Sequence, residues 1–134
     1  MIKEADVIKL YLPFPNISEK LAKYRHMYAV ENNRYSLFVI QTAKPYLVRN
    51  KILKNYITLD CGADSPVKHR SYLGMDLRFI IENIKISDQA KTKVGLSKLI
   101  LRKISSQAKF VAQEITIDQA DVINLNETIT VLDK

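Results

Sequence analysis

The first 81 residues of this chain consist of short apolar runs, each closed by residues that favour turns. The runs lie at residues 7–12, 27–30, 35–41, 56–59, 71–75 and 78–81. Pro13 and Pro15 end the first run, because proline cannot donate a hydrogen bond to a β-ladder. The run from Tyr35 to Gln41 (YSLFVIQ) is predicted to be a central strand. Strands this short and this closely spaced favour a small β-barrel.

The periodicity changes after residue 86. Ser87 and Ser97 are candidate helix N-caps. The apolar residues that follow the i, i+3, i+4 spacing of an amphipathic helix are Leu96, Leu99, Ile100 and Ile104. This helix is predicted to end near Ser105-Ser106, and residues 113–117 and 127–131 look extended. The expected fold class is mainly β with α (α+β), a small β-barrel with a C-terminal helix and a β-rich or extended tail.

Length and composition indicate one domain. A chain of 134 residues that is 47% hydrophobic can build a core of its own. We divide it into residues 1–110, the barrel with its final helix, and residues 111–134, an acidic C-terminal extension of the same domain. No apolar run approaches the roughly 18 residues of a membrane helix, and the start MIKEAD is unlike a signal peptide. A cytoplasmic protein without a membrane partner is expected.

The charge is divided unevenly along the chain. Residues 1–110 hold 20 Lys and Arg against 9 Asp and Glu, whereas residues 111–134 hold 1 against 5. A basic body favours polyanionic partners, because neutralising phosphates releases condensed counterions. A solvated lysine-rich surface without such a partner is the alternative that charge alone leaves open.

Several common site motifs are missing from the sequence. The chain has 3 glycines and no Gly-rich phosphate loop, and it has neither HExxH nor GxSxG. Its single cysteine, Cys61, excludes an internal disulfide and a multi-cysteine zinc site. Its 2 histidines, His26 and His69, stand outside any run of metal ligands. We therefore expect no metal and no cofactor.

Residues 6–105 carry a series of short motifs in a particular order. They are Asp6-Val7-Ile8, Pro13-Phe14, a basic loop with Lys20, Lys23 and Arg25, the strand from Leu37 to Thr42, Asp76 with Arg78, and Val94-Gly95-Leu96-Ser97. In this order they resemble the MazF/PemK family, the toxins of bacterial toxin–antitoxin pairs. The resemblance implies an SH3-like barrel, metal-independent cleavage of single-stranded RNA, a cognate antitoxin protein and a homodimer.

The implied reaction is attack of a ribose 2′-OH on the neighbouring phosphorus, which leaves a 2′,3′-cyclic phosphate. It needs a base, an acid and stabilisation of the charge on the phosphorane. Arg25 suits the last role, since a guanidinium is always charged and matches two phosphate oxygens. Thr42 is a hydrogen-bond donor to the same phosphate. His26 or Asp76 is the candidate base, and His69 is a candidate acid.

Further cations are candidates for contacts with RNA. With the imidazole of His69, they are Lys20, Lys23, Lys44, Arg49, Lys68, Arg70 and Arg78. Five tyrosines stand among the cations, at Tyr24, Tyr28, Tyr46, Tyr56 and Tyr72. Such tyrosines suit stacking on unpaired bases. The alternative for each is a barrel residue whose hydroxyl reaches the rim.

Other functions remain open. One is a catalytically inactive SH3-like module of a phage or mobile element that binds RNA or protein. It is favoured by Ala43 and Gly74, which stand where family members carry a serine and, in some, an arginine. Another is a phage or plasmid accessory protein whose acidic tail docks on its basic face. Residues 111–134 either shield an RNA groove or complete the fold as edge strands, and their many apolar residues favour the fold.

Overall fold

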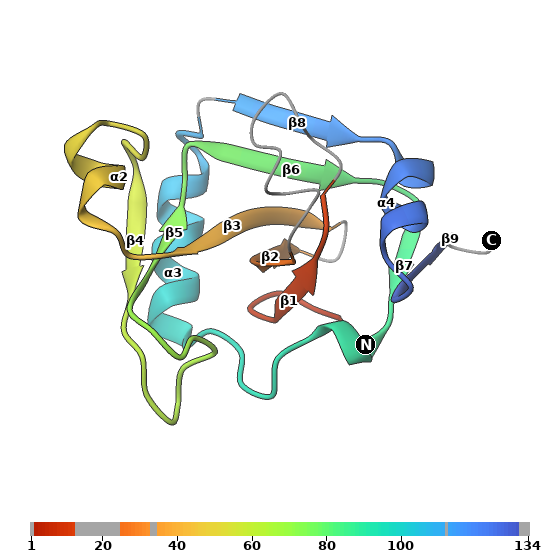
Figure 1. Ribbon diagram of the computed structural model, residues 1–134, viewed down its shortest axis with the longest axis horizontal. Helices are drawn as coiled ribbons and strands as arrows, with labels where there is room; N and C mark the ends of the chain where they lie inside the picture. Colours follow the sequence, from red (N-terminus) through yellow and green to blue (C-terminus); the bar gives the residue numbers. More distant parts are fainter. Residues whose placement is uncertain (1, 13–24, 33–34, 112, 132–134) are drawn as a thin grey trace.

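The computed structural model describes residues 2–12, 25–32, 35–111 and 113–131, and shows a mixed sheet with short helices around it (Figure 1). The strands are β1 (Val7–Leu10), β2 (His26–Asn32), β3 (Ser36–Thr42), β4 (Tyr56–Leu59), β5 (Ser71–Gly74), β6 (Leu77–Ile81), β7 (Ile84–Ile86), β8 (Gln113–Ile117) and β9 (Ile129–Val131). The helices are α2 (Pro45–Arg49), α3 (Lys98–Ala108) and α4 (Gln119–Leu125), with a 3-10 turn η1 at Asp88–Ala90. The predicted class, mainly β with α, is confirmed.

Strand β3 is the centre of the sheet, as the sequence predicts. It pairs with β2 on one side, and on the other side it has two partners in turn. Its first residues, Ser36 and Leu37, face β6, whereas its last three, from Ile40 to Thr42, face β5. Strand β5 then continues to β4, and β6 continues to β8. The sheet therefore forks along β3.

The predicted SH3-like barrel does not close among the described residues. Closure would place β1 against the strand at the far edge of the sheet, β4 or β8. Residues 91–96 take the outer edge of β1 instead, since Ile8 bridges Lys91 and the Val7 carbonyl accepts a hydrogen bond from the Thr92 N–H at 2.8 Å. Gly95 permits this close approach, because a Cβ there would lie 2.7 Å from the Ala5 oxygen.

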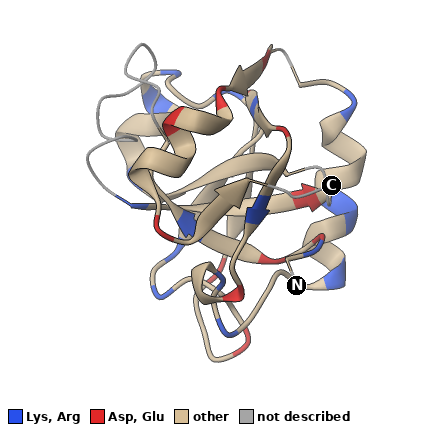
Figure 2. Cartoon of the chain, turned by 90° about the vertical axis from the view of Figure 1, so that its right-hand side faces the viewer, with Lys and Arg blue, Asp and Glu red and all other residues tan. Residues whose placement is uncertain are grey.

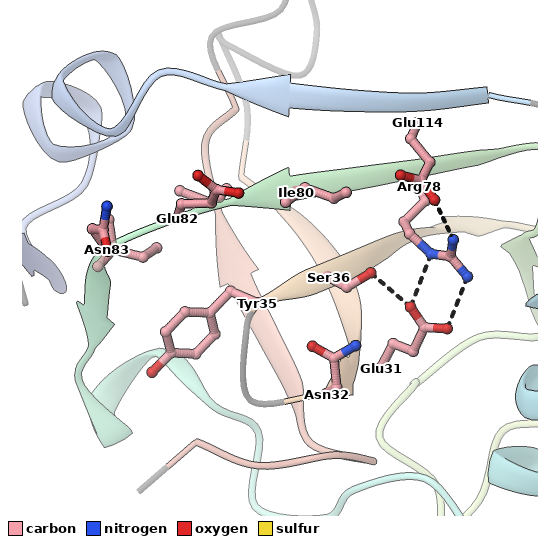
Figure 3. Close-up of a pocket in the computed structure, with 11 residues that line it drawn as sticks. Glu31, Asn32, Tyr35, Ser36, Arg78, Ile80, Glu82, Asn83 and Glu114 are labelled. Carbon is pink, nitrogen blue, oxygen red and sulfur yellow. Dashed lines mark hydrogen bonds and ion pairs between the residues drawn. The ribbon is translucent and has the colours of Figure 1, made fainter.

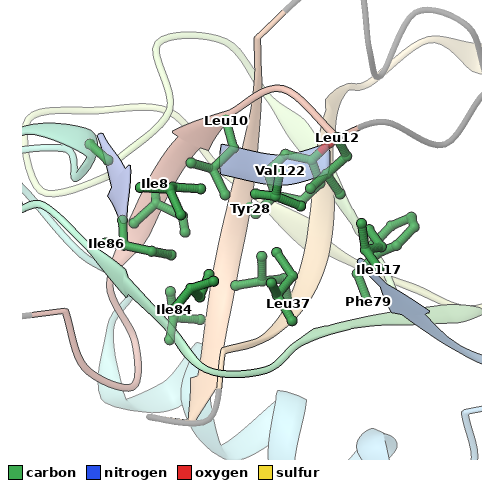
Figure 4. Close-up of a cluster of buried hydrophobic side chains, with 14 of the residues drawn as sticks. Ile8, Leu10, Leu12, Tyr28, Leu37, Phe79, Ile84, Ile86, Ile117 and Val122 are labelled. Carbon is green, nitrogen blue, oxygen red and sulfur yellow. The ribbon is translucent and has the colours of Figure 1, made fainter. Parts of the chain in front are cut away.

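The two faces of the sheet bury two separate cores. Leu37 and Val39 point to the first core, which β7, α4 and β9 help to cover (Figure 4). Phe38 and Ile40 point to the second core, into which Ile104 of α3 packs. Every residue from Ser36 to Ile40 is buried, so β3 has a continuous buried run in place of alternation.

Helix α3 forms where the apolar spacing predicts it. The Ser97 hydroxyl caps it by accepting a hydrogen bond from the Ile100 N–H at 3.2 Å. Its apolar stripe packs mainly on the chain's own second core: Ile104 is fully buried, and Leu96 and Ile100 are partly buried. Leu99 is the member of the stripe that remains 60% exposed.

The C-terminal segment is built into the fold. Strand β8 runs parallel to β6, and its Ile115 and Ile117 are buried in the first core with Val122 and Ile129. The buried amide of Asn126 holds the backbone of Tyr11, accepting from its N–H and donating to its carbonyl, each at 2.8 Å. Figure 1 places α4 and β9 at the end of the molecule opposite α2.

Some elements differ from the predictions. Helix α2 and helix α4 were not expected, although Pro45 at the first helical position and the Asp118 cap are ordinary start signals. Strand β7 was not expected either, because its pairing with β9 depends on residues more than 40 positions away. The predicted turns at 13–15 and 33–34 and the helical turn at 18–22 lie outside the described residues.

Tyr28 gives a test of the first core. Its ring is fully buried and meets Phe79 edge-on at 6.2 Å, while its hydroxyl has no hydrogen-bond partner among the described residues. Because burial of the hydroxyl costs free energy, we expect Tyr28→Phe to raise the free energy of unfolding by about 1 kcal/mol in urea denaturation at pH 8.

Burial also raises the pKa of Tyr28 above its usual range, so the phenolate forms first in the unfolded chain. Wild type should therefore lose stability as the pH rises above about 10, by up to roughly 1.4 kcal/mol per pH unit from this group. Tyr28→Phe removes this contribution, and the gap between the two proteins should widen with pH. A gap that is the same at pH 8 and pH 11 would contradict the assignment.

Asn126 gives a test of the C-terminal segment. Asn126→Ala leaves the Tyr11 N–H and carbonyl without their partner, so we expect it to lower the free energy of unfolding by about 2–3 kcal/mol. Asn124→Ala is the matched control: it removes an exposed amide from α4, the helix that Asn126 follows, and should change stability little. Equal midpoints in urea for the two variants would show that the amide does not hold the segment in place.

Candidate functional site

Three strand ends meet at one end of the sheet. Strand β2 begins at His26, β3 ends at Thr42 and β5 begins at Ser71. The antiparallel register places Thr42 opposite Ser71, and the Ala43 N–H donates to the Arg70 carbonyl at 2.9 Å. Residues that precede β2, follow β3 and precede β5 are therefore neighbours in space although they are far apart in the sequence.

A hollow of about 430 Å³ opens at this meeting point, and we call it the basic hollow. Its charged and polar lining includes Lys9, Arg25, His26, Thr42, Lys44, Lys68, His69 and Ser71. Apolar lining comes from Met27, Ile40, Leu47 and Val67, and Gln41 and Tyr46 also line it. Both histidines of the chain are present, and no aspartate or glutamate of the described residues lines it.

The strand register shows which face of the sheet carries the basic hollow. Lys9 lies opposite Met27, and Met27 lies opposite Ile40, so the three share one face. Ile40 belongs to the second core, so the hollow opens on the same face as α3. His26 alternates with Met27 and lies opposite Leu10, a residue of the first core. His26 therefore meets the hollow at its rim.

The cations of the basic hollow are exposed. Lys9, Arg25, Lys44 and Lys68 are all exposed, and none forms an ion pair with a carboxylate of the described residues. Their potentials add at one place, since no carboxylate among the described residues of the lining cancels them. Such a concentration of unpaired positive charge attracts a polyanion and holds phosphate groups.

Several predicted site residues lie away from the hollow. Asp76 accepts hydrogen bonds from the Lys54 and Asn55 N–H groups at 2.8 and 2.9 Å, so its carboxylate orders that loop. Arg49 ends α2 outside the lining, and the guanidinium of Arg70 lies 4.0 Å from exposed Asp60. Lys20 and Lys23 lie outside the described residues.

Arg78 is part of a separate structure. It lines a second hollow of about 630 Å³, shown in Figure 3, together with Glu31, Ser36, Glu82 and Glu114. The Arg78 NH2 donates to the Glu31 carboxylate at 3.0 Å, its Nε lies 2.9 Å from the same carboxylate as an ion pair, and its NH1 donates to Glu114 at 2.6 Å. Burial disfavours the charged guanidinium, but its hydrogen bonds to both glutamates, together with their negative charges, outweigh burial and raise the pKa of Arg78. Arg78, which the sequence predicts to contact RNA, is therefore occupied by Glu31 and Glu114 of the protein itself.

The structure separates the five tyrosines that the sequence left equivalent. Tyr28 is buried in the first core, and the rings of Tyr56 and Tyr72 contact each other with centroids 4.7 Å apart. Tyr24 lies outside the described residues. Tyr46 is the one that lines the basic hollow, where it is 40% exposed.

Sequence reasoning missed one cation of the basic hollow, Lys9. The alternation of β1 could have revealed it: Lys9 stands between Ile8 and Leu10, which are buried in the first core, so its side chain lies on the opposite face of the sheet. No group of three His, Cys, Asp or Glu able to hold a metal ion occurs among the described residues.

No helix in the described ranges has the length and apolar character that crossing a membrane requires. Comparison with protein-family models, with curated proteins and with solved structures finds no match to this chain.

Proposed function

We propose that the chain is a MazF/PemK-like toxin of a type II toxin–antitoxin system, an endoribonuclease that cleaves single-stranded RNA without a metal. The observation that carries this proposal is the basic hollow, which gathers cations, a strand-end threonine and both histidines, with no carboxylate of the described residues in its lining. Of the catalytic residues that the resemblance implies, Arg25, Thr42 and His26 line it together. Because the proposed substrate is cellular RNA, we propose that the protein acts in the cytoplasm.

The groups of the basic hollow match the needs of the reaction. As the 2′-oxygen bonds to phosphorus and the 5′-oxygen leaves, negative charge grows on the non-bridging oxygens. The guanidinium of Arg25 and the ammonium of Lys44 stabilise this charge, and the Thr42 hydroxyl donates to the same oxygens. Two proton transfers remain, from the 2′-OH and to the 5′-oxygen. We assign them to the imidazoles of His26 and His69, because Asp76 is engaged at the loop of Asn55.

A non-catalytic RNA- or protein-binding module is the second candidate. Arg25, Thr42 and His69 are exposed, and His26 reaches the hollow only at its rim. Catalysis favours side chains that packing holds in place, whereas binding of a polyanion needs only the summed charge. The same hollow would then retain RNA, or an acidic protein segment, without cleaving it.

Cleavage distinguishes these two functions. Purified protein should cut single-stranded RNA in the presence of EDTA and leave a 2′,3′-cyclic phosphate. Arg25→Ala and His69→Ala should each slow cleavage by roughly 100-fold, because each removes a group that acts in the transition state. Lys85→Ala, an exposed lysine on β7, is the control and should cut like wild type.

Two outcomes would contradict the enzyme. One is RNA of mixed sequence that stays intact after long incubation with wild type but is still bound. The other is Arg25→Ala protein that cuts as fast as Lys85→Ala protein. RNA binding without cleavage would show that the chain is a non-catalytic binding module.

The proposed partners are a second copy of the chain and an antitoxin. An acidic, extended antitoxin segment suits the charge of the basic hollow.

For the homodimer, α3 and the residues after it expose Leu99 and Phe110, which are 60% and 80% accessible. We expect light scattering at micromolar concentration to give twice the 15.4 kDa of one chain. Leu99→Asp should shift it toward the monomer, and a wild-type mass of one chain would refute the dimer.

A further inference from the structure

Tyr46 has an unusual environment for a tyrosine on this surface. It is 40% exposed and, within the part of the chain that the structure describes, it is the one tyrosine or phenylalanine that lines the basic hollow, together with Thr42 and Lys44. The other exposed large hydrophobic residues, which are Ile52, Leu99, Phe110, Leu125 and Val131, do not line it. Its ring also has no aromatic partner among the described residues. A partly exposed aromatic ring thus lies beside cations that no described carboxylate neutralises.

The backbone around Tyr46 is held in place. Pro45 fixes the entry to α2, and the Leu47 N–H donates to the Lys44 carbonyl at 3.0 Å. The Tyr46 carbonyl accepts from the Asn50 N–H at 2.9 Å, and Leu47 is buried beneath the helix. The ring therefore extends from an anchored turn, which lowers the conformational entropy lost when a ligand packs on it.

We propose that Tyr46 stacks on an unpaired base of the nucleotide whose phosphate the basic hollow holds. Base–aromatic stacking beside a cationic groove is how proteins retain single strands without reading their sequence. In a duplex both faces of a base are covered by its neighbours, so the Tyr46 ring selects single-stranded over double-stranded RNA. This inference rests on the proposed RNA-binding function of the hollow, but it does not require that the RNA be cleaved.

The test measures binding to a single-stranded RNA oligonucleotide that carries 2′-O-methyl groups and cannot be cut. Tyr46→Ala should raise Kd by about tenfold, because it removes one stacked base. Tyr46→Phe keeps the ring and should bind like wild type, whereas Tyr46→Leu keeps the bulk and should bind like Tyr46→Ala. Leu125→Ala is the control: Leu125 has the same 40% exposure on α4, at the opposite end of the molecule.

Two further measurements separate stacking from charge. Tyr46→Ala should leave the slope of log K against log salt unchanged, whereas Lys44→Ala should reduce it by about 0.7. With wild-type protein, oligonucleotides that carry one abasic position should bind more weakly when that position is the stacked one. The same abasic oligonucleotide should show no difference between wild type and Tyr46→Ala.

Failure of this inference is distinct from failure of the proposed enzyme. Equal binding by wild type and Tyr46→Ala, or equal affinity for single-stranded and duplex probes, would overturn the stacking role even if the protein cuts RNA. Conversely, a Tyr46-dependent preference for single strands in a protein that never cuts RNA would support this role and refute the nuclease.

Discussion

The burial of β3 on both of its faces is the constraint on which the rest of the structure depends. Every residue from Ser36 to Ile40 is buried, and from Leu37 to Ile40 alternate side chains enter two different cores. A strand of this kind needs cover on both sides, and the chain supplies α3 for one face and the β7–β9 pair with α4 for the other. The C-terminal segment is therefore required by the central strand, since without it Leu37 and Val39 would lose part of their cover.

The fork in the sheet gives the two ends of β3 opposite electrostatic surroundings. At its start, the Ser36 hydroxyl donates to Glu31, and the cation there, Arg78, is paired with Glu31 and Glu114 within the protein. At its end, Thr42 opens onto cations that no described carboxylate neutralises. Arg78 of β6 thereby links β2 and β8, and it also donates to the Ala108 carbonyl at the end of α3 at 3.0 Å. Unpaired, exposed charges do little for stability, and for this reason we assign the functional site to the end of β3.

Local patterns in the sequence were sufficient for much of the fold. Strand β4 and strand β8 begin and end where the apolar runs predict, and Ser97 caps α3 as expected. Local patterns could not predict whether the sheet closes into a barrel, since closure depends on which segment occupies the edge of β1. For the site, the ends of apolar runs located Arg25 and Thr42. The sequence could not show that Arg78 lies away from the basic hollow, because its partners Glu31 and Glu114 are 47 and 36 positions away in the chain.

The placement of the acidic C-terminal segment bears on how the basic hollow meets its ligand. The acidic residues Asp118 and Asp121, at the start of α4, lie at the end of the molecule opposite α2 (Figure 1), and Figure 2 shows charges of both signs on that end. Surface charges farther apart than roughly 8–10 Å are largely screened at physiological salt, so these acids do not cancel the field of the hollow. On the proposed function, the acidic segment therefore leaves the positive field of the hollow open to RNA and does not shield it.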